Sequence, residues 1–193
     1  SCRKYILKNK EGDLVSPSQI DDNWLSNTVN ENFDKIKLLY IGRIKVEKGI
    51  YSLLDIIKNE NEIELTIVGA EKNVSQNINQ NNVNVYEIES NRQKLIKFYD
   101  DHNIFILPSF TEGHPMALLE ALARKRPVII FEEIKHVMGD KKGIFVSKRN
   151  SDSLIETINY IKINYKKIIK QMEQNKLPSN KDFIKEFGSL ISN

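Results

Sequence analysis

The sequence predicts an α/β domain built on a doubly wound parallel sheet of about six strands, with helices at its C-terminal end. Short apolar, β-rich runs alternate with helical patterns between residues 37 and 150. This alternation is typical of a parallel sheet covered on both faces. From residue 151 onward, apolar side chains repeat with a helical period instead.

The chain divides into three expected parts. Residues 1–36 are polar and irregular, and we interpret them as a lead-in from a missing N-terminal domain. Residues 37–150 form the α/β domain, which no repeat or low-complexity linker interrupts. Residues 151–193 are expected to be helices packed on the same domain. A length of 193 residues suits one large domain with a substantial core.

Each expected element follows from local periodicity. Strands are expected at 36–41, 63–68, 83–88, 104–107, 127–131 and 144–146. Helices are expected at 50–57 and 92–99, from Pro115 onward, at 151–172 and at 183–191. Ser151 or Asp152 is the expected cap of the long helix.

Composition excludes several classes of protein. The net charge is only +3 and acidic and basic residues are interspersed, whereas a nucleic-acid binder is expected to show a clustered basic face. No apolar run reaches 18 residues and no signal-peptide pattern opens the chain. The single cysteine, Cys2, cannot form an internal disulfide. We therefore expect a cytoplasmic protein that does not bind nucleic acid.

Metal chemistry is not expected. The three histidines, His102, His114 and His136, show no ligand spacing with one another. There is also no Asp-x-Asp pair to hold a divalent ion on a diphosphate.

The stretch that follows the 104–107 strand carries the first half of a candidate site. Gly113 is expected to allow a tight turn, and Pro115 suits the first position of a helix. Free amides and the positive end of the helix dipole would then face the carboxyl edge of the sheet, as in a phosphate site. Glu112 and Glu120 flank this point and suit hydroxyl groups on either side of a phosphate. Alternatively, Glu112 is a solvated loop residue and Glu120 lies on a wet helix face.

The second half of the candidate site follows the 36–41 strand. Gly42-Arg43 ends that strand, and Lys48-Gly49 precedes the next helix. In a doubly wound sheet the ligand crevice lies where the winding reverses, typically between the first and fourth strands, so the two loops would be neighbours. Arg43 and Lys48 could neutralise a diphosphate and stabilise charge on a departing phosphate. Taken singly, either residue is more often a surface charge.

These motifs together resemble the donor-binding half of retaining glycosyltransferases of family 4, which have the GT-B fold. The resemblance covers about residues 37–172. The motifs are Gly42-Arg43, Lys48-Gly49, Pro108-Ser109, Glu112-Gly113 and Glu120-Ala121. It implies a Rossmann-like domain, one half of a GT-B fold, with the acceptor held by another domain. The sequence departs from the family pattern at Gly69-Ala70-Glu71 and at residues 131–137.

The resemblance also implies roles for individual residues. Arg43 and Lys48 would contact the donor diphosphate, Glu112 the transferred sugar and Glu120 the ribose, with the first three acting in catalysis. The remaining members of the expected binding set are Gly42, Gly113, His114, Pro115, Met116 and Ala117. Of these, the backbone around residues 114–117 would meet the distal phosphate and sugar. No cofactor is implied, because the UDP- or GDP-sugar is the donor substrate, and such enzymes are usually metal-independent.

The expected function is transfer of a sugar from a nucleotide sugar to a glycan or glycolipid acceptor. We expect the chain to be inactive in isolation, and the full-length protein to touch the inner face of the membrane through its missing half. Two alternatives stay open: a related epimerase or hydrolase of nucleotide sugars, and a non-catalytic nucleotide-binding domain. A dehydrogenase is disfavoured because the 36–41 strand is not followed by Gly-x-Gly-x-x-Gly.

Overall fold

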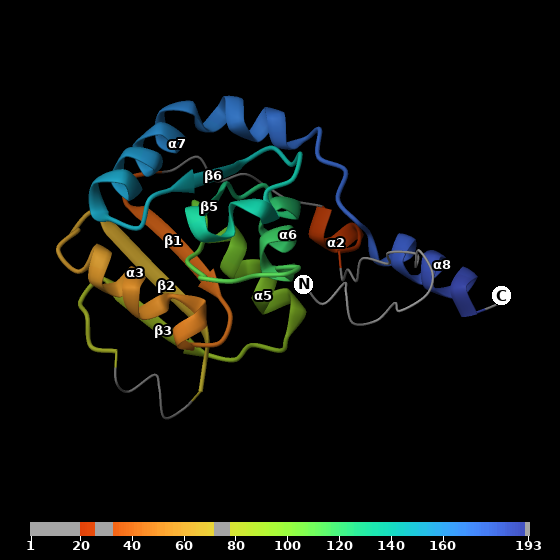
Figure 1. Ribbon diagram of the computed structural model, residues 1–193, viewed down its shortest axis with the longest axis horizontal. Coiled ribbons are helices and arrows are strands. Elements are labelled where there is room, and N and C mark those ends of the chain that lie inside the picture. Colours follow the sequence, from red (N-terminus) through yellow and green to blue (C-terminus); the bar gives the residue numbers. More distant parts are fainter. Residues whose placement is uncertain (1–19, 26–32, 72–77, 192–193) are drawn as a thin grey trace.

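The computed structural model describes residues 20–25, 33–71 and 78–191 (Figure 1). Its centre is a sheet of six parallel strands in the order β3-β2-β1-β4-β5-β6. The strands are β1 (Ile36–Ile41), β2 (Ile63–Ala70), β3 (Val83–Glu87), β4 (Ile104–Leu107), β5 (Val128–Phe131) and β6 (Ile144–Ser147). The predicted fold class is therefore confirmed.

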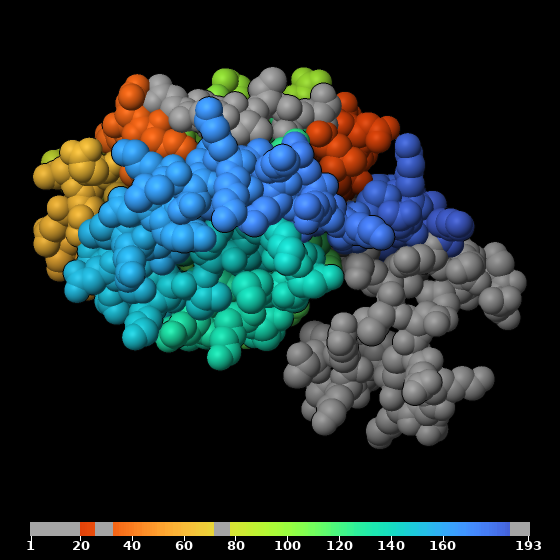
Figure 2. All heavy atoms as spheres, turned by 90° about the horizontal axis from the view of Figure 1, so that it is seen from above, coloured from red at the N-terminus to blue at the C-terminus, as the bar shows by residue number. Residues whose placement is uncertain are grey.

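Helices fill the connections between the strands. They are α2 (Asp22–Leu25), α3 (Ile50–Ile57), α5 (Arg92–Asp100), α6 (Met116–Ala123), α7 (Ser151–Met172) and α8 (Asn180–Ile191), with 3₁₀ turns η1 (Val46–Lys48) and η2 (Glu132–Val137). The connections carrying α3 and α5 cross the sheet in opposite directions. Because such crossovers are right-handed, they cover opposite faces. Helix α7 lies along the β6 edge (Figures 1 and 2).

The central strands are short, apolar and buried on both faces. Every residue of β4 and β5 is buried, as expected for parallel strands with helices on either side. β1 pairs with β2 on one side, where Ile36 faces Ile63, and with β4 on the other, where Leu38 faces Ile104. The winding therefore reverses between β1 and β4, as predicted.

The cap of α7 differs from the prediction. Asn150, rather than Ser151 or Asp152, has the extended backbone of a cap residue, and its side chain accepts a hydrogen bond from the amide of Ser153 at 2.9 Å. An asparagine oxygen suits this role as well as serine or aspartate does. The α8 helix begins at Asn180, three residues before the expected start.

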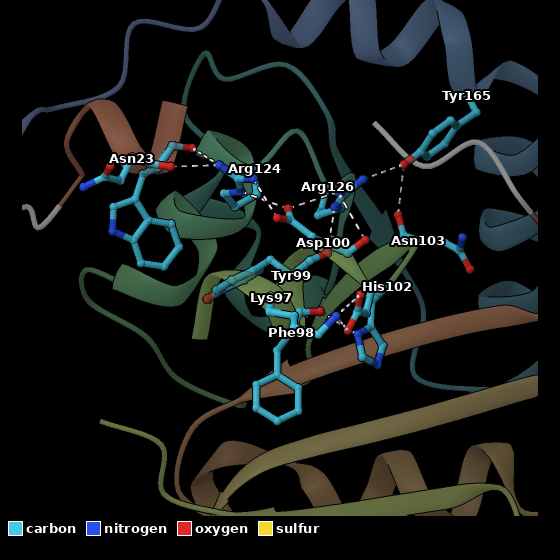
Figure 3. Close-up of polar contacts among 12 residues, drawn as sticks. Asn23, Lys97, Phe98, Tyr99, Asp100, His102, Asn103, Arg124, Arg126 and Tyr165 are labelled. Atoms are coloured by element: carbon cyan, nitrogen blue, oxygen red, sulfur yellow. Dashed lines mark hydrogen bonds and ion pairs between the residues drawn. The ribbon is translucent and has the colours of Figure 1, made fainter. Parts of the chain in front are cut away.

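Two buried arginines join α5 to the end of α6. Arg124 and Arg126 are 3% and 1% exposed, and both form ion pairs with Asp100, at 2.7 and 3.3 Å (Figure 3). Arg124 also donates to the carbonyls of Asn23 and Trp24, at 3.0 Å each. The α2 segment is thereby attached to the domain through Arg124, which directly follows α6.

The remaining boundaries of the three parts stay predictions. Helix α2 falls within the expected lead-in, and residues 1–19 and 26–32 of that lead-in lie outside the described residues. Helix α8 lies next to α2, where the amide of Asn180 donates to the carbonyl of Ile20 at 2.8 Å (Figures 1 and 2). Within the described ranges, none of the helices has the length and apolar character needed to cross a membrane.

Candidate functional site

A crevice of about 180 Å³ opens at the carboxyl ends of β1 and β4. Its position is the point where the sheet reverses its winding, which is where open α/β sheets bind ligands. Its lining consists of Tyr40, Ile41, Gly42, Lys48, Leu107, Glu112, His114, Pro115, Met116 and Ala117. Seven of the ten residues predicted for the site therefore surround one space.

The loops that follow β1 and β4 are held together by backbone contacts as well as by side chains. The amide of Phe110 donates to the carbonyl of Glu47 at 3.0 Å. Gly49 has a φ of 67° and lies so close to Pro108 that an added Cβ would clash with the Pro108 carbonyl oxygen. Only glycine fits this approach without strain. The prediction that the loops after β1 and β4 are neighbours is confirmed.

Lys48 and Glu112 meet across the crevice. The Lys48 Nζ lies 2.6 Å from the Glu112 Oε1, and the Ser109 hydroxyl donates to the same oxygen at 2.7 Å. The Glu112 side chain is only 10% exposed, so the alternative of a freely solvated loop glutamate is wrong. The Glu112 carboxylate compensates the charge of Lys48. An incoming anion would compete with Glu112 for the ammonium group.

Arg43 lies at the rim. It lines an adjoining hollow of about 160 Å³ that shares Ile41 and Gly42 with the crevice. Its side chain is exposed, and the described part of the chain offers its guanidinium no hydrogen bond or ion pair. The Arg43 carbonyl accepts a hydrogen bond from the Tyr40 hydroxyl at 2.9 Å. The structure thus places Arg43 beside the crevice rather than in its lining.

Tyr40 is a part of the crevice that the sequence analysis did not identify. Burial, and next the negative charge of Glu112, raise the pKa of Tyr40 well above its usual range. The hydroxyl consequently remains a proton donor and holds the turn that carries Arg43.

The start of α6 forms the opposite wall. Met116 and Ala117 both line the crevice, and the first amides of a helix have no partner within the helix. Pro115 is the cap residue, with φ −75° and ψ 101°, instead of the first helical residue. The expected role of Gly113 is wrong: its φ is not positive, and an added Cβ would meet nothing within 4 Å. The turn therefore does not depend on glycine at this position.

Gly113 lines a different and larger hollow, of about 560 Å³, between α6, η2 and the start of α8. His114 and Pro115 line both spaces. Since those two residues separate the hollow from the crevice, Gly113 lies next to the crevice without facing it.

Glu120 is buried, with 3% exposure, and its Oε2 accepts a hydrogen bond from the Tyr99 hydroxyl at 2.7 Å. The alternative of a wet helix face is therefore wrong. Glu120 does not line the crevice itself, but lies one helical turn beyond Met116 and Ala117, which do. Its predicted contact with a ribose stays a prediction.

Arg149 supports the loop after β4 and was missed by the sequence analysis. Its Nη1 donates to the Pro108 carbonyl at 2.9 Å and its Nη2 to the Ser109 carbonyl at 3.4 Å. The guanidinium also stacks between the rings of Phe110 and Phe131, at 4.1 and 4.3 Å. A single arginine in the turn after β6 gives no local signal of these contacts.

Two further contacts fix this region. The His136 Nε2 donates to the Glu112 carbonyl at 2.8 Å, which connects η2 to the crevice loop. Glu133 accepts a hydrogen bond from the Arg149 Nε at 2.8 Å, and this hydrogen bond lowers the pKa of the Glu133 carboxyl.

Among the described residues, no three metal-ligating side chains lie close enough together to hold an ion.

The fold and the crevice define a Rossmann-like α/β domain that matches one half of a GT-B glycosyltransferase. Residues 24–177 match the family model described as glycosyl transferases group 1, and the chain belongs to that family. The chain is 28% identical over 157 residues to the capsular polysaccharide biosynthesis glycosyltransferase CapM of Staphylococcus aureus, covering 72% of this chain and 40% of CapM.

Solved structures show the same fold. Sucrose-phosphate synthase of Thermosynechococcus elongatus superposes with a TM-score of 0.75 at 17% identity, covering 98% of this chain and 54% of that one. Anabaena HepE in complex with UDP and glucose gives a TM-score of 0.71 at 13% identity, covering 91% of this chain and 55% of HepE. The chain thus spans about half the length of these relatives, or less.

Proposed function

We propose that this chain is the donor-binding half of a retaining, family 4 hexosyltransferase. It would bind a nucleotide sugar, from which the complete enzyme transfers the sugar to a glycan or glycolipid acceptor. The observation that carries this proposal is the convergence of Lys48, Glu112 and the start of α6 on one crevice at the β1–β4 junction. Membership of glycosyl transferases group 1 supports it.

The crevice groups suit the chemistry of glycosyl transfer. When the bond between a sugar and a nucleoside diphosphate breaks, negative charge grows on the departing phosphate. Lys48, Arg43 and the first amides of α6 would stabilise that charge more than the ground state. As Lys48 turns from Glu112 to the phosphate, the carboxylate would be released to accept hydrogen bonds from the sugar hydroxyls. The Lys48–Glu112 pair would thus separate when donor binds.

The donor proposed first is a UDP-sugar, with a GDP-sugar as the alternative. The structural neighbour HepE is described in complex with UDP and glucose, which supports the choice of uridine. We propose that no metal assists the diphosphate, since the two basic residues and the helix amides supply positive charge. The acceptor would be held by a second domain, through which the complete, cytoplasmic enzyme would also contact the membrane.

A thermal-shift panel tests donor binding. UDP, GDP, ADP and their sugars are added to the chain and to Arg43→Ala and Lys48→Ala variants. We expect Lys48→Ala to weaken binding about tenfold or more, because a charge-assisted bond contributes about 1.5–3 kcal/mol. Lys58→Ala is the matched control, since Lys58 is an exposed lysine at the other end of α3.

The outcomes separate the candidate functions. Binding that neither Arg43→Ala nor Lys48→Ala weakens would favour a non-catalytic domain whose ligand lies elsewhere. Sugar transfer by the isolated chain would contradict the proposed need for a second domain. Product analysis with the full-length protein separates transfer from epimerisation or hydrolysis of the donor.

A further inference from the structure

Tyr99 belongs to α5, and its hydroxyl is directed at Glu120 of α6. We propose that Tyr99 is a positioning residue that orients the Glu120 carboxylate for the ribose hydroxyls of the donor. This inference rests on the proposed function, because it assumes that Glu120 contacts ribose. It adds a residue from α5, outside both crevice loops, to the groups that determine nucleotide recognition.

The Tyr99 hydroxyl contacts two residues of α6, Glu120 and Ala117. It donates to the Glu120 Oε2 at 2.7 Å and lies 3.2 Å from the carbonyl of Ala117. Because a hydroxyl has one proton, the shorter contact is the main hydrogen bond and the carbonyl is a weaker, shared acceptor. Ala117 lines the crevice. One hydroxyl therefore holds the carboxylate and also contacts the first turn of the helix that carries it.

Tyr99 itself has little freedom to move. Its side chain is fully buried, and its ring packs against Trp24 of α2 at 5.6 Å and Phe105 of β4 at 5.7 Å, measured between ring centroids. Such aromatic contacts favour defined ring orientations. A ring held between a strand and the α2 segment can act as a fixed support for the carboxylate.

The helices on either side of this hydrogen bond are also joined next to it. Asp100, which follows Tyr99, pairs with Arg124, one turn beyond Glu120 (Figure 3). The α5–α6 contact is thus fixed at two successive turns of α6, by Tyr99 and by Asp100. The position of Glu120 relative to the sheet is consequently set from α5.

The direction of the hydrogen bond is maintained across the working pH range. Burial, and next the charge of Glu120, hold the pKa of Tyr99 well above its usual range. The hydroxyl therefore stays protonated and donates, while the carboxylate accepts. Removing the hydroxyl alone should leave the ring packing intact but allow the carboxylate to adopt other rotamers.

The test compares UDP with 2′,3′-dideoxyuridine diphosphate, which lacks both ribose hydroxyls, by calorimetric titration of the 193-residue chain. We expect the unchanged chain to prefer UDP about tenfold, and Glu120→Gln to remove most of that preference. Tyr99→Phe should reduce the preference about threefold or more, with the dissociation constant for the dideoxy nucleotide unchanged. Tyr165→Phe is the matched control, since its buried hydroxyl contacts Arg126 and Asn103 instead.

A purely structural role of Tyr99 would weaken both nucleotides equally, and that result would overturn the inference. A preference lost in Glu120→Gln but kept in Tyr99→Phe would overturn it too, while leaving the proposed function intact. If UDP does not bind the unchanged chain, the proposed function fails and the inference fails with it. If Glu120→Gln keeps the preference, the ribose contact of Glu120 and this inference are both wrong.

Discussion

Replacing Arg149 by methionine should loosen the loop after β4. The substitution removes a charge-assisted hydrogen bond to the Pro108 carbonyl at 2.9 Å, worth about 1.5–3 kcal/mol. It also removes stacking on Phe110 and Phe131, worth about 0.5–2 kcal/mol. The ion pair with Glu133 adds about 1 kcal/mol at most, because that carboxylate is partly exposed. Methionine keeps part of the apolar packing, so we expect a net loss of about 3 kcal/mol.

Urea denaturation followed by circular dichroism measures this loss. Arg92→Met is the control: Arg92 pairs with Asp21 at 2.8 Å but is 43% exposed, so its removal should cost less than about 1 kcal/mol. We also expect Arg149→Met to weaken UDP binding, since its contacts hold the loop that carries Ser109 and Glu112. Equal stability of the Arg149 and Arg92 variants would refute the role assigned to Arg149.

Two further substitutions test the contact between the loops after β1 and β4 and the pH dependence of stability. Gly49→Ala should lower the free energy of unfolding by about 3 kcal/mol, since its Cβ would meet the Pro108 carbonyl and its φ of 67° disfavours alanine. Gly113→Ala is the control: its Cβ would enter open space, so stability in the same urea titration should be unchanged. Similar losses in both variants would contradict the close contact between Gly49 and Pro108. Burial lowers the pKa of His102 below its ordinary value of 6.5, so the unfolded chain binds a proton that the folded chain resists, and the free energy of unfolding should fall as the pH drops below about 6.5. His102→Gln should flatten that slope between pH 7 and pH 5, and an unchanged slope would show that other groups cause it.

The local pattern of apolar residues was sufficient to predict the strands next to the crevice. β1 and β4 have the bounds expected from their short apolar runs, because a strand buried on both faces needs an uninterrupted apolar sequence. The junction between them followed from the winding rule for such sheets. Membership of glycosyl transferases group 1 agrees with the family resemblance at that level, while family 4 and the retaining outcome stay proposals.

Long-range contacts account for what the sequence could not predict. Arg149 donates a hydrogen bond to the carbonyl of Pro108, 41 positions away. The local sequence around either residue does not indicate this contact. Nothing in the local sequence indicates that Arg124 and Arg126 are buried, yet both pair with Asp100 inside the domain. The buried Glu120 accepts a hydrogen bond from Tyr99, which comes from another helix. Burial of a charged group depends on its partner, and only the folded chain brings the partners together.

The proposed function requires the loops after β1 and β4 to hold a diphosphate between them. A crystal structure of the chain with UDP would locate that diphosphate. We expect its oxygens within hydrogen-bond distance of the Lys48 Nζ and of the first amides of α6, with the Lys48–Glu112 contact opened. A diphosphate bound in the larger hollow beside Gly113, with the Lys48–Glu112 contact intact, would contradict it.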